Sequence, residues 1–394
     1  MKVLMINSVC GIRSTGRICT DLARELEKRG HTVKIAYGRA SIPKEYGNNA
    51  YKIGNNSDVA LHGLWSRLND SSGFKSLTAT KKLIEWIKDY DPDVIHLHNL
   101  HGYYVNVPLL FSFLAESRKR VVWTLHDCWP FTGHCCYFEF AGCEKWKTGC
   151  GNCPQKEAYP ASFTDRSDRN YERKKAAFCS LSDMTLVTPS VWMGNLVRQS
   201  FLNKYPVKTI HNWVDLNRFK KTDNDFKSRY GLEEKHIVLG VSSGWEKRKG
   251  LDDFILLRNC LGENYQIVLL GLNDKQLKAI PRDIIGLKQT DSVDELAQLY
   301  SAADVYVNPT WEDNFPTTNL EAIACGTPVV SYDTGGSGES AEMFGFSVQK
   351  GNTDKLAEAI VNIINGAGLA YPDLRKYNSA SLSAYVKLLE GDES

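Results

Sequence analysis

Two carboxylates in the C-terminal part of the sequence, Asp313 and Glu321, are separated by seven residues. The residues after Asp313 predict a turn and then a short helix, which Gly326 and Pro328 end. Thr318 and Glu321 have the spacing of a capping box, so in one reading Glu321 only caps this helix. In the other reading, the carboxylates and the free amides of the helix start hold a polyhydroxylated ligand that carries phosphate.

A basic run that ends in Arg248-Lys249-Gly250 directly follows an expected strand, His236 to Ser243. Cationic side chains at the carboxyl end of a strand can neutralise a diphosphate as it departs, because negative charge develops there. A charged helix start with solvated side chains is the alternative. The pattern favours an anion site.

The first expected strand, Lys2 to Val9, runs into a loop that contains Gly11 and Gly16 and ends at Arg17. Glycines let the backbone approach a ligand, and the helix expected from Arg17 to Arg29 can place its first amides on a phosphate. The loop lacks the G-x-G-x-x-G fingerprint, so an ordinary strand-to-helix turn is the alternative.

Histidines gather at the ends of two other expected strands. His126 ends the strand from Val121, where an imidazole can form hydrogen bonds with a donor hydroxyl or an acceptor group. His96 and His98 alternate onto one face of the strand Val94 to His98, with His101 nearby. We expect polar packing for these three, with metal binding as the alternative, and a structural role is the alternative for His126.

The stretch from Gly240 to Gly336 resembles the retaining glycosyltransferases of the GT-B fold in family 4, which build bacterial polysaccharides. Asp313 stands where the family usually has Glu in its acid-x7-acid signature, and Glu321 is the second acid. Lys249-Gly250 resembles the end of the family's Arg-x4-Lys-Gly motif, whose Arg position is Gly244 here. Arg248, or Arg17 from the other domain, would replace that arginine. Glu312 is one residue out of register for the first acid.

The resemblance implies roles for individual residues. His126, Asp313 and Glu321 would form the catalytic set, with Asp313 on the donor sugar and Glu321 on the ribose. The expected donor-binding residues are Gly16, Arg17, Arg248, Lys249, Thr290, Asn314, Phe315, Pro316 and Thr317. No catalytic metal is expected, because fixed cations would take its place.

Alternating strands and helices predict an α/β fold with two Rossmann-like, doubly wound parallel sheets facing a cleft. The remaining strands are expected at Val33 to Tyr37, Thr185 to Pro189, Val207 to His211, Tyr265 to Gly271, Ile284 to Lys288, Asp304 to Asn308, Pro328 to Tyr332 and Gly345 to Val348. We expect an acceptor-side domain at 1–215 and a nucleotide-sugar domain at 216–376. The segment 377–394 would form a helix that crosses back to the first domain, as in GT-B proteins.

Five of the eleven cysteines crowd into the loop from Trp129 to Pro154, within an insertion at 128–154. A reducing compartment disfavours disulfides. Four thiolates could instead bind a structural zinc and hold together a loop with little other structure. The predicted ligands are Cys135, Cys143, Cys150 and Cys153, with free thiols as the alternative.

Charge is uneven along the chain. Residues 1–200 carry 27 Lys/Arg and 19 Asp/Glu, whereas the remainder carries 21 and 27. Basic residues near an anionic membrane contribute about 1 kcal/mol each, although a merely solvated surface is an equal reading. No signal peptide and no apolar run of about 20 residues is visible. We therefore expect a cytoplasmic protein, peripheral on the inner face of the plasma membrane, with no nucleic-acid partner.

The resemblance, with these patterns, implies a retaining glycosyltransferase that moves a hexosyl unit from a UDP- or GDP-sugar to a growing, lipid-linked surface polysaccharide. A GT-B sugar-nucleotide epimerase is one alternative. A non-catalytic nucleotide-sugar-binding or zinc-stapled scaffold is the other. Activity with and without an acceptor separates the three.

Overall fold

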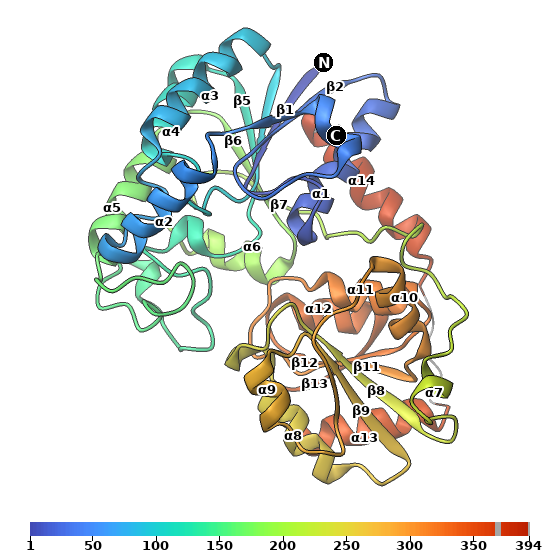
Figure 1. Ribbon diagram of the computed structural model, residues 1–394. Helices are drawn as coiled ribbons and strands as arrows, with labels where there is room; N and C mark the ends of the chain where they lie inside the picture. Colours follow the sequence, from blue (N-terminus) through green and yellow to red (C-terminus); the bar gives the residue numbers. More distant parts are fainter. Residues whose placement is uncertain (367–371, 393–394) are drawn as a thin grey trace. The chain divides into compact units, whose positions relative to one another are not determined.

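The computed structural model describes residues 1–366 and 372–392, which form two compact units (Figure 1). Unit 1 comprises Met1–His211 and the chain from Ser381 onward, and unit 2 comprises Asn212–Ala380. The sequence placed these boundaries at 215 and 376. The expected ranges 216–376 and 377–394 include residues 367–371 and 393–394, which lie outside the described residues.

Unit 1 is built on a seven-stranded parallel sheet in the order β3-β2-β1-β4-β5-β6-β7. Its strands are mostly buried and rich in Val, Ile and Leu, as expected where helices cover both faces of a sheet. The strands are β1 (Lys2–Asn7), β2 (Thr32–Tyr37), β3 (Ala50–Lys52), β4 (Val94–Leu97), β5 (Arg120–Thr124), β6 (Met184–Thr188) and β7 (Val207–Thr209).

The helices of unit 1 lie on both faces of this sheet. Figure 1 shows α3, α4 and α5 on one face and α1 on the other. The helices are α1 (Arg13–Lys28), α2 (Asn56–Asn69), α3 (Leu77–Tyr90), α4 (Val107–Ser117), α5 (Ser167–Phe178) and α6 (Val191–Arg198). α1 buries Ile18, Leu22 and Leu26, the face that the sequence periodicity predicts.

Helix α14 (Leu374–Glu390) begins in unit 2 and ends in unit 1. The Tyr385 hydroxyl lies 3.1 Å from the Thr124 hydroxyl, inside unit 1. The Arg120 guanidinium donates to the carbonyl of Leu389 at 3.2 Å. These contacts attach the end of α14 to strand β5.

Unit 2 is built on a six-stranded parallel sheet in the order β10-β9-β8-β11-β12-β13. The strands are β8 (His236–Val241), β9 (Tyr265–Leu270), β10 (Ile285–Leu287), β11 (Val305–Asn308), β12 (Val329–Asp333) and β13 (Gly345–Gln349). The helices are α7 (Phe226–Arg229), α8 (Leu251–Cys260), α9 (Asp274–Ala279), α10 (Val293–Ala302), α11 (Thr317–Ala324), α12 (Gly335–Phe344) and α13 (Thr353–Ile364).

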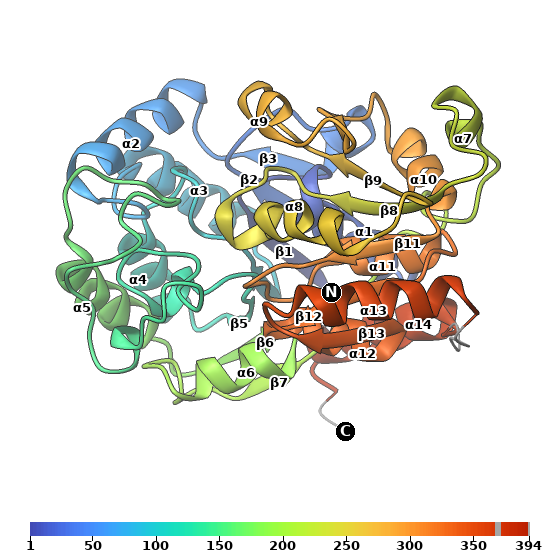
Figure 2. The same ribbon diagram turned by 90° about the horizontal axis from the view of Figure 1, so that it is seen from below.

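The helices of unit 2 form two layers around its sheet. Figure 1 shows α10, α11 and α12 on one face, and Figure 2 shows α8 and α13 side by side on the other. The predicted fold class, two doubly wound parallel sheets, is therefore confirmed. Within the described part of the chain, no helix is both long and apolar enough to cross a membrane.

Candidate functional site

The candidate site of unit 2 lies at the carboxyl edge of its sheet, where β8 and β11 are neighbours. The chain order reverses between these strands, and ligands of doubly wound sheets bind at such a switch point. The Trp311 amide donates to the Arg248 carbonyl at 2.7 Å, so the loop after β11 is joined to the loop after β8. Gly250 (φ 77°) permits this approach, because a Cβ there would lie 2.1 Å from the Pro309 carbonyl oxygen.

Lys249 and Asp313 form an ion pair across these two loops. The Lys249 Nζ lies 2.5 Å from the Asp313 Oδ2, and the two side chains are 23% and 15% exposed. A partly buried, charge-assisted contact of this kind orients both groups. The structure therefore brings together a cation and a carboxylate that the sequence assigned to one ligand.

Asp313, rather than its neighbour Glu312, faces solvent. Glu312 is fully buried, and its carbonyl accepts from the Arg248 guanidinium at 3.2 Å. Arg248 also pairs with the Glu246 carboxylate at 3.0 Å. Through its two contacts Arg248 joins the loop after β8 to the loop after β11. The placement favours Asp313 as the ligand-facing acid.

Glu321 lies on α11 and is 4% exposed. The Tyr300 hydroxyl donates to its Oε2 at 3.2 Å, and burial followed by the Glu321 charge raises the pKa of Tyr300. Burial raises the pKa of Tyr306 on β11, and the charges of Glu321 and Asp313 add to this increase. The two acids therefore lie within electrostatic range of one tyrosine.

The predicted capping box is wrong. α11 begins at Thr317, with Pro316 as its N-cap and no side-chain cap. Proline favours the start of a helix because its φ is already helical. Thr318 therefore lies inside the first turn, and the Glu321 carboxylate accepts from the Tyr300 hydroxyl.

The remaining predicted donor residues of unit 2 lie on loops at the same edge. Asn314, Phe315 and Pro316 are buried in the turn before α11, and the Phe315 carbonyl accepts from the Asn212 side chain at 3.1 Å. Thr317 opens α11 and is half-buried. Thr290, also half-buried, follows β10 at the far end of the sheet order.

Sequence reasoning missed the residues that support the Asp313 loop from beneath. The Asp253 carboxylate accepts from the Trp311 indole at 2.8 Å and from the Tyr332 hydroxyl at 2.7 Å. The Gly336 amide donates to the Asp313 carbonyl at 3.0 Å. Gly335 (φ 54°) leaves space for the Asp313 carbonyl, because a Cβ added at this position would lie 2.3 Å from that oxygen. The Gly-Gly pair after a strand was the available signal.

The glycine loop of unit 1 is shorter than expected. α1 begins at Arg13, four residues before the predicted start, so Gly16 and Arg17 lie within the helix. Gly16 is buried, and a Cβ there would approach the Val9 side chain to 3.1 Å. Close packing against β1 therefore accounts for this glycine, and Arg17 is half-buried one residue further along.

His126 belongs to a histidine cluster at the carboxyl edge of the unit 1 sheet. Its Nε2 lies 2.9 Å from the Nδ1 of His98, and the two rings stack. His96 Nε2 lies 2.8 Å from the Thr124 hydroxyl. Burial, partly opposed by the Asp127 charge, lowers the pKa of His126 to about 4. The ring is therefore neutral near pH 7 and can form hydrogen bonds without carrying charge.

The predicted zinc ligands share the loop that carries η3 (Lys145–Lys147). A hydrogen bond with Cys135 lowers the pKa of Cys153 to about 7, whereas burial raises that of Cys150 to about 11. Among the described residues, the set of metal-ligating atoms within 4.8 Å of one another is His101, Asp127 and Cys136, not the predicted four cysteines. The four predicted thiols do not form a compact tetrahedral set in the structure. A zinc ion bound by these cysteines therefore stays a prediction.

The two doubly wound units define a fold class, the GT-B fold. A sucrose-phosphate synthase from Thermosynechococcus elongatus aligns with a TM-score of 0.63 at 16% identity, covering 99% of this chain and 97% of its own. HepE of Anabaena, solved with UDP-glucose, aligns with a TM-score of 0.60 at 15% identity, covering 99% and 95%. These similarities concern the fold alone.

The chain belongs to glycosyltransferase family 4. The model of that family matches residues 15–218, and the model of glycosyl transferases group 1 matches residues 235–366. WcaC of Escherichia coli K12, named for colanic acid biosynthesis, is 38% identical over 247 residues, covering 61% of this chain and 60% of WcaC. CapM of Staphylococcus aureus, named for capsular polysaccharide biosynthesis, is 25% identical over 218 residues, covering 50% and 55%. The chain thus spans little more than half the length of these relatives, and the family predicted from the sequence is confirmed.

Proposed function

We propose that this chain is a retaining glycosyltransferase that transfers a hexosyl unit from a nucleotide-diphospho-sugar to a growing, lipid-linked surface polysaccharide. The observation that carries the proposal is the arrangement of Lys249, Asp313 and Glu321 at the switch point of unit 2. The names of WcaC and CapM support a polysaccharide product. The UDP-glucose in HepE supports a UDP-sugar donor, with a GDP-sugar as the alternative.

In this proposal Lys249 binds the donor diphosphate, Asp313 binds hydroxyls of the donor sugar, and Glu321 binds the ribose. In the structure the Lys249 ammonium pairs with the Asp313 carboxylate. A bound diphosphate would also interact with this ammonium. The lysine then stabilises the charge that develops on the leaving group. Arg248, held by Glu246 and the Glu312 carbonyl, keeps the loop in position.

The transfer breaks the bond between the anomeric carbon and the diphosphate oxygen, and forms a bond from that carbon to an acceptor hydroxyl on the same face. The acceptor proton passes to the departing phosphate oxygen. In unit 1, neutral His126 would form hydrogen bonds with reacting hydroxyls, and Gly16 and Arg17 lie on α1 near the end of β1. The acceptor reaches the enzyme at the inner face of the plasma membrane.

The positive charge at the diphosphate comes from fixed side chains in this proposal, so a catalytic metal is not invoked. A structural zinc in the segment 128–154 remains part of the proposal. The hydrogen bond between Cys135 and Cys153 supports it, because it brings together two of the four predicted ligands.

The function is tested by incubating the protein with UDP- and GDP-sugars, with and without a lipid-linked acceptor. Sugar transfer to the acceptor, with the donor's anomeric configuration kept, is the expected result. Isomerised nucleotide sugar without an acceptor would instead indicate an epimerase. Nucleotide binding without turnover would indicate a scaffold. A thermal-shift screen with UDP and GDP identifies the base, because ligands that bind the folded state stabilise it.

A further inference from the structure

Helix α2 in unit 1 has polar side chains on its inner face and apolar side chains on its outer face. His62 and Ser66 are buried, each 1% exposed. The outward residues follow a spacing of three and four, which puts them on one stripe of the helix. This outer stripe consists of Leu61, Leu64, Trp65 and Leu68, which are 57%, 55%, 47% and 43% exposed. Contiguous apolar surface of this kind marks a partner or a membrane.

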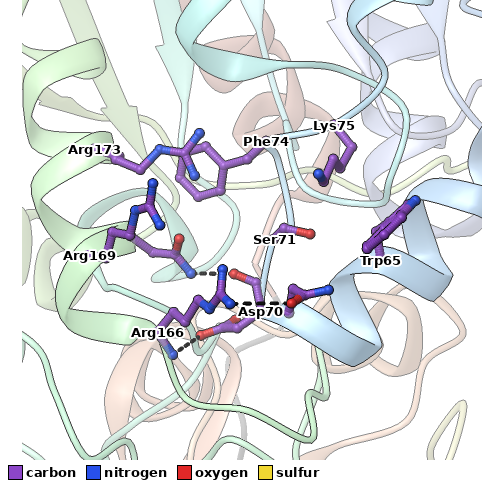
Figure 3. Close-up of a pocket in the computed structure, with 10 residues that line it drawn as sticks. Trp65, Asp70, Ser71, Phe74, Lys75, Arg166, Arg169 and Arg173 are labelled. Carbon is purple, nitrogen blue, oxygen red and sulfur yellow. Dashed lines mark hydrogen bonds between the residues drawn. The ribbon is translucent and has the colours of Figure 1, made fainter.

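A cationic pocket of about 290 Å³ lies beside this stripe. Arg166, Arg169 and Arg173, from the start and body of α5, share one side of the pocket because they are three and four residues apart. Figure 3 shows Arg173 against the Phe74 ring, and Lys75 and Trp65 on the side of the space opposite the arginines. Trp65 thus belongs to both features, and the Lys75 Nζ lies 4.9 Å from its ring centre.

The lining of this pocket carries more cations than acids. Among the residues that the structure describes, Lys75, Arg166, Arg169 and Arg173 form no ion pair with a carboxylate. Asp70 is the acid in the lining, and its two oxygens are occupied by other groups. One lies 2.6 Å from the His134 Nδ1, and the other accepts from the Arg166 amide at 3.0 Å. The lining thus brings four cations to one carboxylate, and both oxygens of that carboxylate already have partners.

Ser71 supplies an independent observation. The residue lines the pocket and is 7% exposed, and within the described chain its buried hydroxyl has no hydrogen-bond partner. In Figure 3 this hydroxyl extends toward the side where Lys75 and Trp65 lie. Buried hydroxyls are normally satisfied, so the position is suited to a ligand oxygen.

We propose that the pocket binds the phosphate headgroup of a membrane lipid while the α2 stripe enters the headgroup layer. Apolar side chains on one face, with cations at their edge, are the composition of helices that lie in a membrane interface. Arg and Lys bind phosphate, and Trp65 occupies the boundary between the two regions. The inference rests on the proposed function, since binding to membrane lipid would bring unit 1 to the layer that holds a lipid-linked acceptor.

The test is co-flotation with phosphatidylcholine vesicles that do or do not contain phosphatidylglycerol. The triple variant Lys75→Gln, Arg169→Gln, Arg173→Gln is compared with a charge-matched control, Lys28→Gln, Lys82→Gln, Lys88→Gln, whose residues are exposed elsewhere on unit 1. We expect the pocket variant to lose on the order of 100-fold in vesicle affinity, since each cation near an anionic surface contributes roughly fivefold. The control should lose much less, and Leu61→Ser with Leu64→Ser should also weaken binding.

Equal losses of vesicle affinity in the two triple variants would overturn the role of the pocket, because net charge alone would then explain binding. Tight binding of inorganic pyrophosphate without vesicle binding would overturn the assignment of a membrane lipid as the ligand. Binding of a protein to the stripe in the absence of vesicles would overturn it too. Circular dichroism establishes that each variant is folded. UDP and GDP binding by the wild type is measured in parallel. If the proposed function fails, the wild type binds neither nucleotide, whereas failure of this inference leaves nucleotide binding intact.

Discussion

The Lys249 ammonium lies 2.5 Å from the Asp313 carboxylate, so the two groups proposed to hold opposite ends of a sugar donor contact each other in unit 2. Each side chain orients the other, and the backbone of both loops is fixed by the contact between Trp311 and the Arg248 carbonyl. A donor that binds here inserts between two groups that are already in place. Such preorganisation lowers the cost of positioning.

Replacing Lys249 with alanine should lower the rate of sugar transfer by about 100- to 1,000-fold, since a charged donor to the leaving group is lost. Steady-state transfer from the preferred nucleotide sugar measures this effect. Lys247→Ala is the matched control, because Lys247 lies in the same turn and is exposed. A wild-type transfer rate in the Lys249→Ala variant would contradict the assignment of Lys249 to the donor site.

Glu321→Gln should weaken UDP binding by roughly 10- to 100-fold, as expected for the loss of a hydrogen bond to a charged group. The sharper measurement compares UDP with 2′-deoxy-UDP by calorimetry. If Glu321 binds the ribose, wild type prefers UDP and the variant shows no preference. Tyr300→Phe removes the hydroxyl that donates to Glu321 and should keep the preference. A preference retained in Glu321→Gln argues against the ribose assignment.

Gly335→Ala should disturb the Asp313 loop. The new Cβ would lie 2.3 Å from the Asp313 carbonyl oxygen, at a φ of 54° that costs alanine about 1–2 kcal/mol before any clash. We expect a lower unfolding midpoint and slower transfer. Gly262→Ala is the control, because its Cβ would meet nothing within 4 Å. Equal stability of the two variants would contradict the tight approach.

Unit 1 should lose stability in mild acid before unit 2 does. Burial lowers the pKa of His62 to about 4 and that of His96 to about 3, and lowers that of His98 well below its usual value. The unfolded chain therefore binds more protons than the folded chain below about pH 6.5.

Stability falls as the pH drops from about 6.5 toward 4, by up to about 1.4 kcal/mol per pH unit for each such histidine. Hydrogen exchange at pH 7.5 and 5 reports on each unit separately. Unit 2, whose histidine His236 is half-buried, is the internal control. Equal acid sensitivity in both units would contradict the prediction.

Metal analysis should find one zinc for each chain if the predicted cysteines bind it. Cys150→Ser with Cys153→Ser should then release the metal and lower the unfolding temperature, since structural zinc stabilises the folded state. Cys260→Ser is the control, because Cys260 is exposed on unit 2. Zinc-free protein with reactive thiols would establish the alternative of free cysteines.

The sequence predicted the sheets well because each strand is a short apolar run that helices cover on both faces. The run expected from His236 to Ser243, for example, contains β8. Helix starts were less accurate. α1 extends back to Arg13 through residues with no strong local signal, and Pro316 displaced the start of α11 from the predicted cap.

The site was predicted as a set of residues, not as a geometry. Motif spacing selects Lys249 and Asp313, but their contact depends on the pairing of β8 with β11, which are far apart in the chain. The reversed pattern of α2 was also missed, because an apolar stripe in a sequence is normally read as a buried face. Only the burial of His62 and Ser66 shows which face is inside.

Unit 1 is discontinuous in the chain, and this has a consequence for synthesis on the ribosome. Its core includes Tyr385, Val386, Leu388 and Leu389, each at most 2% exposed, which are made after all of unit 2. At the usual speed of translation, the residues of unit 2 take roughly 10–30 s to synthesise. During that interval the face of unit 1 that α14 covers remains open. Unit 2, although its synthesis begins later, can therefore complete its folding before unit 1 does.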